Sequence, residues 1–417
     1  MFKFKLRSRI YGVGLMIAFF LSGHTVGLSL AATEIQYWTN HTAADPGKYF
    51  SHTLEPPTEK FMQEHPNIKI KFVEISHQYF QDKVNTALAT GKGPDMWDAE
   101  IGWTYDYYNR GILAEPPKEF VDLLKQSVLP APLRTLTVKG KVVGGIPPYT
   151  DCLALFYNKD HFVEAGLGTP PENWEELEEY ALKLTKRGES GKLTQSGFSQ
   201  WEAYEHVFWS FFFQNGGEFF DQDPIKMITS KEAIEAAQFA FKDPYQVWNV
   251  AALDFYEGYQ GFTAGKVSMY VDGNWRLFTF DTKFPNLHYS AAELPKHKKR
   301  ATTQGGWNVL INKKSSPEIW TYAKFLISDE VNKTRLEVNF LPATKTAYQN
   351  VDWSQYNPNL KFFYRSLDYA RAMPFFEGFQ KFKKTLNSKM EEIIGTDITV
   401  EEAFNYIAER MRRELVR

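Results

Sequence analysis

The sequence predicts an α/β fold built on a parallel sheet, and three observations carry that prediction. Residues 34–40 and 68–75 alternate in polarity as strands do, and residues 94–100 have the composition of a third strand. Residues 54–65 and 80–90, which lie between these strands, have helical patterns, and the second helix stops at Gly91. Strands and helices that alternate in this way are typical of a parallel sheet with crossover helices.

The length of the chain indicates about two domains. It has 417 residues, of which 43% are hydrophobic and 24% charged, an ordinary globular composition. Glycines and prolines interrupt residues 141–148, and the apolar strand 153–157 follows. We interpret this segment as the crossing between the domains. Further on, we expect helices at 175–186, 317–327 and 400–415 and a strand at 302–311.

Polar and aromatic side chains gather at the carboxyl ends of the three predicted strands, where ligands bind in parallel sheets. The first end carries Trp38, Asn40 and His41, the second is followed by His77 and Gln78, and the third closes on Glu100. This convergence predicts a binding cleft at one edge of the sheet.

Residues 1–31 have the pattern of a secretory signal peptide. Four basic residues precede the apolar run 10–21, and small residues offer cleavage near Ala31 or Ala32. About twelve apolar residues are too few to span a bilayer comfortably, although an uncleaved anchor is the alternative. Losing the four basic residues changes the formal net charge from −2 to −6, which argues against nucleic acid or an anionic membrane as the main partner.

Cys152 is the single cysteine. No cysteine follows the leader to carry a lipid, and one cysteine forms neither an internal disulfide nor a cysteine-rich metal site. The expected location is therefore the periplasm, for a secreted protein that is not a lipoprotein.

Motifs for catalysis, cofactors and metals are scarce. No HExxH or GxSxG motif occurs, and the nine histidines show no metal spacing. Asp98 and Glu100 share one face of a strand, which leaves a secreted glycoside-active enzyme as an alternative, but nothing indicates the spacing of an acid/base pair. We therefore predict a binding protein with no catalytic residue, no cofactor and no metal.

Several segments in a fixed order resemble one family. They are Ala89–Asp95 (ATGKGPD), Tyr108–Leu113 (YNRGIL), Gly140–Pro147 (GKVVGGIP), Leu155–Lys159 (LFYNK), Pro170–Leu177 (PPENWEEL), Phe262–Trp275 (FTAGKVSMYVDGNW), Gly305-Gly306 and Leu341–Ala343 (LPA). In this order the chain resembles the extracellular solute-binding proteins of ABC importers, in the carbohydrate-binding branch that includes maltose- and glycerol-3-phosphate-binding proteins. Ser268 and Gly144-Gly145 depart from the family pattern.

The resemblance implies two α/β lobes joined by a multi-strand hinge, with the ligand between them and a membrane permease that recognises the closed form. The implied lobes are residues 32–148 plus 302–340 and residues 149–301 plus 341–417. A di- or oligosaccharide is the expected ligand. A glycerol phosphodiester or polyol is the alternative in the same class, and a ligand-sensing partner of a membrane receptor is an alternative outside it.

The resemblance also implies which residues contact the ligand. By family position Trp275 stacks on a sugar ring, unless it packs beneath the cleft. Gly305 and Gly306 let backbone amides approach the ligand, and Glu100 accepts hydrogen bonds from sugar hydroxyls, unless these are a plain turn and a rim charge. Trp307 is either core or contact.

Four further residues complete the candidate set. Tyr149 and Asp151 lie at the domain crossing, where ligand contact and hinge hydrogen bonding are both open. Trp201 belongs to an exposed-looking segment, and Arg371 stands where relatives place an arginine that reaches the ligand. Trp209, in the apolar run 208–213, is expected in the core.

Overall fold

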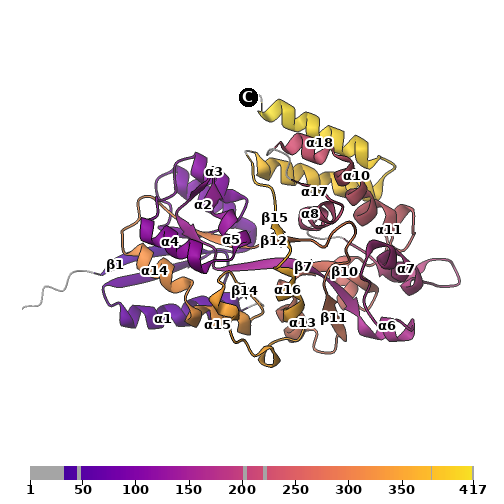
Figure 1. The fold of residues 1–417 in the computed structure, drawn as a ribbon, viewed down its shortest axis with the longest axis horizontal. Helices are drawn as coiled ribbons and strands as arrows, with labels where there is room; N and C mark the ends of the chain where they lie inside the picture. Colours follow the sequence, from indigo (N-terminus) through magenta and orange to yellow (C-terminus); the bar gives the residue numbers. More distant parts are fainter. Residues whose placement is uncertain (1–31, 45–47, 201–203, 219–222, 377, 416–417) are drawn as a thin grey trace, which may run out of the picture.

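The computed structural model describes residues 32–44, 48–200, 204–218, 223–376 and 378–415. Two lobes lie side by side, each built around its own sheet (Figure 1). We call the lobe around the five-stranded sheet the first lobe and that around the eight-stranded sheet the second lobe. This confirms the predicted α/β class and its two-lobed form. The predicted leader, residues 1–31, and Trp201 lie outside the described residues.

The sheet of the first lobe has the strand order β2-β1-β3-β13-β6. Its strands are β1 (Thr33–Thr39), β2 (Ile68–Glu74), β3 (Met96–Glu100), β6 (Gly145–Ile146) and β13 (Trp307–Ile311). β1 pairs in parallel with both β2 and β3, as the alternating pattern predicted, whereas β13 runs antiparallel to β3. The helices around this sheet are η1 (Phe50–Leu54), α1 (Glu55–Glu64), α2 (His77–Ala89), α3 (Trp103–Asn109), α4 (Lys118–Ser127), α5 (Pro130–Thr135), α14 (Ile319–Leu326) and α15 (Asp329–Glu337), with the small ribbon β4 (Thr137–Val138) and β5 (Lys141–Val142).

The sheet of the second lobe is organised by β7 (Tyr149–Asn158), which pairs antiparallel with four other strands. The remaining strands are β8 (Lys186–Arg187), β9 (Leu193–Phe198), β10 (Val267–Gly273), β11 (Tyr289–Ala292), β12 (Thr302–Gly305), β14 (Leu341–Pro342) and β15 (Ala370–Ala372). The helices are α6 (Lys159–Glu164), α7 (Trp174–Leu184), α8 (Tyr204–Gln214), α9 (Pro224–Ile228), α10 (Lys231–Ala237), η2 (Gln238–Lys242), α11 (Asp243–Gln246), α12 (Gly258–Thr263), α13 (Trp275–Lys283), η3 (Thr346–Tyr348), η4 (Trp353–Gln355), α16 (Leu360–Ser366), α17 (Phe379–Gly395) and α18 (Val400–Leu415).

The segment 302–311 is two strands, and its prediction as one continuous strand is wrong. β12 pairs with β7 and β15 in the second lobe, whereas β13 pairs with β3 and β6 in the first. The chain changes sheets at Gly306, whose φ of 124° is a conformation that side-chain-bearing residues rarely adopt. Sheet membership therefore puts this crossing at Gly306 rather than at residue 302, and the other lobe boundaries remain predictions.

Each lobe has an apolar core. Ile35, Met96 and Ile311 belong to that of the first lobe, and α8 lies in that of the second lobe. Trp209 on α8 has no exposed surface, which confirms its prediction as a core residue. Across residues 32–415, apart from the gaps named above, no helix is long and apolar enough to cross a membrane.

Candidate ligand-binding site

The carboxyl ends of β1 and β3 are joined by the buried carboxylate of Asp98. It accepts hydrogen bonds from the Tyr37 hydroxyl (2.7 Å), the Thr39 hydroxyl (2.6 Å) and the Asn40 backbone N–H (3.0 Å). Burial raises the pKa of Asp98 to about 6, although these three donors lower it. Asp98 thus fixes the backbone that presents Asn40 and His41.

His41 points from this backbone towards the hinge strand β7. Its Nε2 lies 3.2 Å from the Tyr149 hydroxyl, and its ring packs on Tyr49 with centroids 4.2 Å apart. Burial lowers the pKa of His41 to about 3, so the imidazole is neutral at physiological pH. His41 and Tyr149, predicted separately, therefore form one polar contact between β7 and the loop after β1.

Asn40, His77 and Trp307 also come together. Asn40 Nδ2 lies 3.3 Å from His77 Nδ1, and the His77 ring meets the Trp307 ring edge-on at 5.5 Å. Trp307 is opposite Glu100 in the β13–β3 register and is partly buried. These residues make a polar and aromatic patch at the end of the first sheet.

The positions of Trp38 and Gln78 differ from those predicted for them at the carboxyl ends of the strands. Trp38 packs against the core cluster beside this patch, and its Nε1 has no hydrogen-bond partner among the described residues. The helix predicted to start at Phe80 starts at His77, so Gln78 is an exposed residue of the first turn of α2 rather than of a strand-end loop. The spacing of apolar residues could not locate the start of α2, because the three residues of α2 that precede Phe80 are exposed.

In the second lobe, Trp275 is the first residue of α13 and is half-buried. Its ring lies against Gly273, where an added Cβ would come within 2.0 Å of it, and meets the His206 ring edge-on at 6.4 Å. The indole thus packs against the second-lobe core on one side while part of its surface stays accessible.

Asp151 lies on β7 opposite Gly305 of β12. The residue is 8% exposed, and its Oδ1 has no hydrogen-bond partner among the residues that the structure describes. Burial raises the pKa of Asp151 to about 6, with His206 opposing the rise and Glu100 adding to it. A Cβ on Gly305 would come within 2.2 Å of Asp151 Oδ1 and 3.0 Å of His206 Nε2, so only glycine leaves room there.

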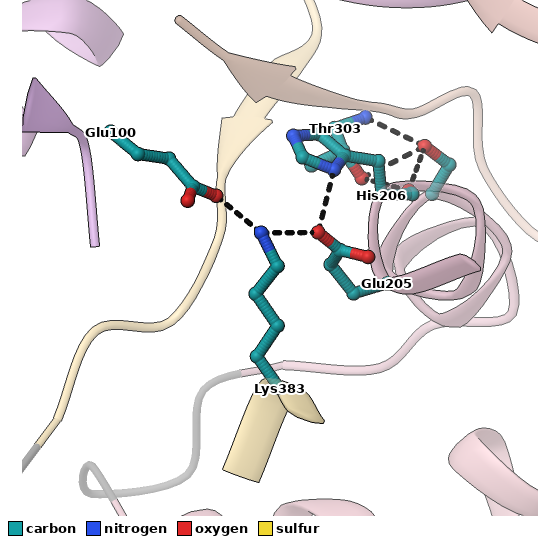
Figure 2. A network of polar contacts seen from close by, with 6 residues as sticks. Glu100, Glu205, His206, Thr303 and Lys383 are labelled. Carbon is teal, nitrogen blue, oxygen red and sulfur yellow. Dashed lines mark hydrogen bonds and ion pairs between the residues drawn. The ribbon is translucent and has the colours of Figure 1, made fainter. Parts of the chain in front are cut away.

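A charged network that the sequence did not reveal links the two lobes (Figure 2). Lys383 Nζ on α17 lies 2.5 Å from Glu100 Oε1 and 2.8 Å from Glu205 Oε1, and Glu205 Oε1 lies 3.3 Å from His206 Nδ1. Thr303 on β12 donates its hydroxyl to the His206 carbonyl (2.7 Å) and holds the start of α8 in place. Glu100 was predicted from the strand ends, but no motif marks the other members.

Mutual pairing overcomes the cost of burial in this network. Burial lowers the pKa of Lys383, but Glu100 and Glu205 raise it well above its usual range. Burial raises the pKa of Glu205, but His206 and Lys383 bring it well below its usual range. Burial also lowers the pKa of His206, and Glu205 raises it above its ordinary value. Lys383 and Glu205 are therefore both charged at neutral pH.

Arg371 lies on β15 and is engaged by its own lobe. Its guanidinium makes two contacts with the Glu218 carboxylate, at 2.9 and 2.5 Å, and lies over the Phe213 ring at 5.0 Å. It is the register partner of Thr303 on the neighbouring strand β12. As a ligand contact Arg371 remains a prediction.

The lobes contact each other beside Glu100. Ile101 packs into the core cluster of the second lobe, and an added Cβ on Gly102 would meet Phe379 and Gln380 of α17 at 2.9 Å. Next to this contact lies a cavity of about 140 Å³ lined by both lobes, with Thr104 and Thr135 on one side and Met373 and Phe376 on the other. The two lobes therefore meet at this contact and share the cavity beside it.

The groups on the two facing edges are suited to binding a polyol. Trp275 offers an apolar indole face in the second lobe, and Asp151, Asn40 and His77 offer carboxylate, amide and imidazole groups for hydrogen bonds. The fold and the site therefore define a two-lobed protein that holds a ligand between its lobes. The chain belongs to the family of bacterial extracellular solute-binding proteins, whose model matches residues 47–333.

Similar proteins agree with this membership. A binding protein of Brucella abortus is 26% identical over 393 residues, which are 89% of this chain and 92% of the relative. The maltodextrin-binding protein of Bacillus subtilis is 26% identical over 315 residues, 68% of this chain and 67% of the relative. An ABC substrate-binding protein of Listeria monocytogenes, solved with cycloalternan, has the same fold with a TM-score of 0.77 and 21% identity, covering 92% of this chain and 99% of that one.

Proposed function

We propose that this protein captures a di- or oligosaccharide between its lobes outside the cytoplasmic membrane and presents it to the permease of an ABC importer. Family membership supports an extracellular solute-binding role. Relatives named for maltodextrin and arabino-oligosaccharide support a carbohydrate as the solute.

One observation carries the choice of a sugar. Asp151 is buried and lies near His206, whose ring contacts that of Trp275. The Oδ1 of Asp151 has no hydrogen-bond partner among the described residues. An unpaired buried carboxylate oxygen is costly, so a bound group that donates a hydrogen bond stabilises it. A sugar supplies hydroxyl donors at its edge and a C–H face for the indole, which matches both groups at once.

Each edge of the cleft has its own role in this proposal. Trp275 stacks on a sugar ring, Asp151 and Glu100 accept hydrogen bonds from hydroxyls, and Gly305 and Gly306 leave room for close approach. The first lobe contributes the patch of Asn40, His77 and Trp307 described above, together with Trp38 and His41, and the hinge contributes Tyr149. Gln78, Trp201 and Arg371 remain predicted contacts for a ligand long enough to reach them.

Export and location form part of the same proposal. A leader of residues 1–31 would be cleaved to release a periplasmic protein with a net charge of −6 and no lipid anchor. The permease in the inner membrane would then recognise the closed lobes.

The charges in the cleft argue against a phosphodiester as the ligand. Lys383 is already shared by Glu100 and Glu205, and Arg371 is held by Glu218. A phosphate placed near Asp151 would therefore meet a carboxylate whose Oδ1 has no partner among the described residues, rather than free cations. Neutral polyols lack this conflict.

Ligand-induced thermal stabilisation tests the proposed solute class. A ligand that binds the folded protein raises its melting temperature by mass action. We expect the mature protein to be stabilised by at least one of maltose, trehalose, sucrose, cellobiose, xylobiose or maltotriose. Stabilisation by glycerol-3-phosphate and by none of the neutral sugars would contradict the proposal.

A further inference from the structure

We propose that Lys383 is a positioning residue that links the two lobes through Glu100, so that closure of the cleft depends on this ion pair. We call Glu100, Lys383 and Glu205 the interlobe triad. The inference rests on the proposed capture function for its purpose, because lobe closure is the step that retains the solute.

The second lobe holds the lysine firmly. Lys383 lies on α17, whose Phe379, Phe382 and Leu386 are buried in the core cluster of that lobe. Glu205 lies on α8 of the same cluster, and its side chain is only 6% exposed. The 2.8 Å contact between Lys383 and Glu205 therefore persists whether the lobes are open or closed.

The first lobe supplies the other carboxylate. Glu100 is the last residue of β3 and so belongs to the sheet of the first lobe. Its 2.5 Å contact with Lys383 reaches across the gap between the lobes, as Figure 2 shows. Hinge opening separates these two groups, because Glu100 lies on β3 of the first lobe and Lys383 on α17 of the second.

Because the Lys383–Glu100 ion pair is largely buried, it should affect the equilibrium between the open and closed lobes. The side chains of Lys383 and Glu100 are 21% and 23% exposed where they contact each other, so their attraction is screened less than that of a surface pair. Opening returns Glu100 to water and leaves Lys383 with Glu205. Because salt screens separated and hydrated charges, raising the ionic strength should favour the open form.

The distance between one label on each lobe measures this equilibrium directly. Lys83 on α2 and Lys231 on α10 are exposed, and these helices stand on either side of the gap (Figure 1). Both are replaced by cysteine and spin-labelled, while the native Cys152 is buried. Distances are measured without sugar at about 10 mM and about 1 M sodium chloride, where the Debye length is about 30 Å and about 3 Å.

Three variants separate the triad from a general loss of structure. Lys383→Met keeps the aliphatic stem and removes the charge. Glu100→Gln leaves the Lys383–Glu205 pair intact and so keeps the second lobe folded. Lys384→Met removes an exposed lysine from the same helix and is the matched control.

We expect the parent protein to populate the short distance at low salt and to shift towards the long distance at high salt. Both Lys383→Met and Glu100→Gln should show the long distance at both salt concentrations, the double variant should open no further, and Lys384→Met should behave as the parent. An unchanged low-salt distance distribution in Glu100→Gln and Lys383→Met would overturn the inference.

Sugar titration of the same samples distinguishes this inference from the proposed function. A triad-dependent distance in a protein that binds no sugar would uphold the positioning role and contradict the capture function. Sugar binding with a distance that ignores both substitutions would uphold capture and contradict the positioning role.

Discussion

The Thr39 hydroxyl donates a 2.6 Å hydrogen bond to the Asp98 carboxylate and so ties the end of β1 to β3. Tyr37 and the Asn40 backbone donate to the same carboxylate. The loop that carries Asn40 and His41 is therefore held by a buried acid rather than by sheet pairing.

Replacement of Asp98 by alanine should loosen that loop. Three buried donors would lose their acceptor, and leaving such groups unpaired typically costs about 1–3 kcal/mol each. We expect the free energy of unfolding to fall by about 3 kcal/mol and sugar affinity to fall with it. Chemical denaturation measures the first effect, with Asp82→Ala on the exposed face of α2 as the control; equal stability of the two variants would contradict this role.

Sugar affinity should decrease as the pH falls below about 6. Burial raises the pKa of Asp151 to about 6, with His206 and Glu100 as the charged groups that face it. Hydroxyl donors favour the ionised carboxylate, so protonation weakens binding. Calorimetric titrations between pH 5 and pH 8 should show this loss in the parent protein and a smaller loss in Asp151→Asn. If the pH dependence of sugar affinity is the same in Asp151→Asn as in the parent protein, a group other than Asp151 is responsible for it.

The free energy of unfolding, unlike the sugar affinity, should increase as the pH falls over the same range. Because the pKa of Asp151 and of Asp98 is raised in the folded state, the folded protein binds more protons than the unfolded chain between about pH 4 and pH 6. Their contribution to the free energy of unfolding therefore falls as the pH rises through that window and is constant above it. Denaturation at several pH values checks the sign, and Asp151→Asn should remove part of the slope.

A methyl group at Gly305 should abolish tight binding. It would come within 2.2 Å of Asp151 Oδ1 and would displace the carboxylate or His206. We expect Gly305→Ala to lower sugar affinity by at least about tenfold, roughly the 1.4 kcal/mol of one lost hydrogen bond to a charged group. Gly168→Ala, where the added methyl meets nothing within 4 Å, is the matched control and should bind as the parent does.

Trp209 and Trp275 should respond differently to truncation. Trp209 is fully buried, so Trp209→Ala creates a cavity and should lower the free energy of unfolding by about 3–5 kcal/mol. Trp275 is half-buried and is a proposed sugar contact, so its replacement should lower mainly the sugar affinity. Thermal denaturation of the two variants would contradict this distinction if Trp275→Ala were the less stable.

Much of the fold was predictable from local patterns. The alternating segments 34–40 and 68–75 are parallel neighbours in the first sheet, and the run 208–213 is core, because strand and helix periodicity record which face is buried. The split of 302–311 at Gly306 was not predictable from periodicity. Both halves are buried strands, and the pattern does not say which sheet each one joins.

The candidate site was predictable only in part. A strand end nominated Glu100, the predicted domain crossing nominated Asp151, and a family motif nominated Trp275, because these positions follow from local sequence. Lys383 was not predicted as a site residue because it lies 283 residues from Glu100 and is one of several lysines on its helix. Only the packing of α17 against the end of β3 brings the two charges together.

Calorimetric titration of the parent protein and of Trp275→Ala with a neutral oligosaccharide such as maltotriose tests the central claim most directly. Trp353→Ala, a partly buried tryptophan in a separate cluster, is the control. The proposed site predicts saturable binding that is retained in Trp353→Ala and weakened at least about tenfold in Trp275→Ala, since stacking on an aromatic ring contributes on the order of 1 kcal/mol beyond the buried area. Saturable binding with the same affinity in all three proteins would contradict it and place the ligand away from Trp275.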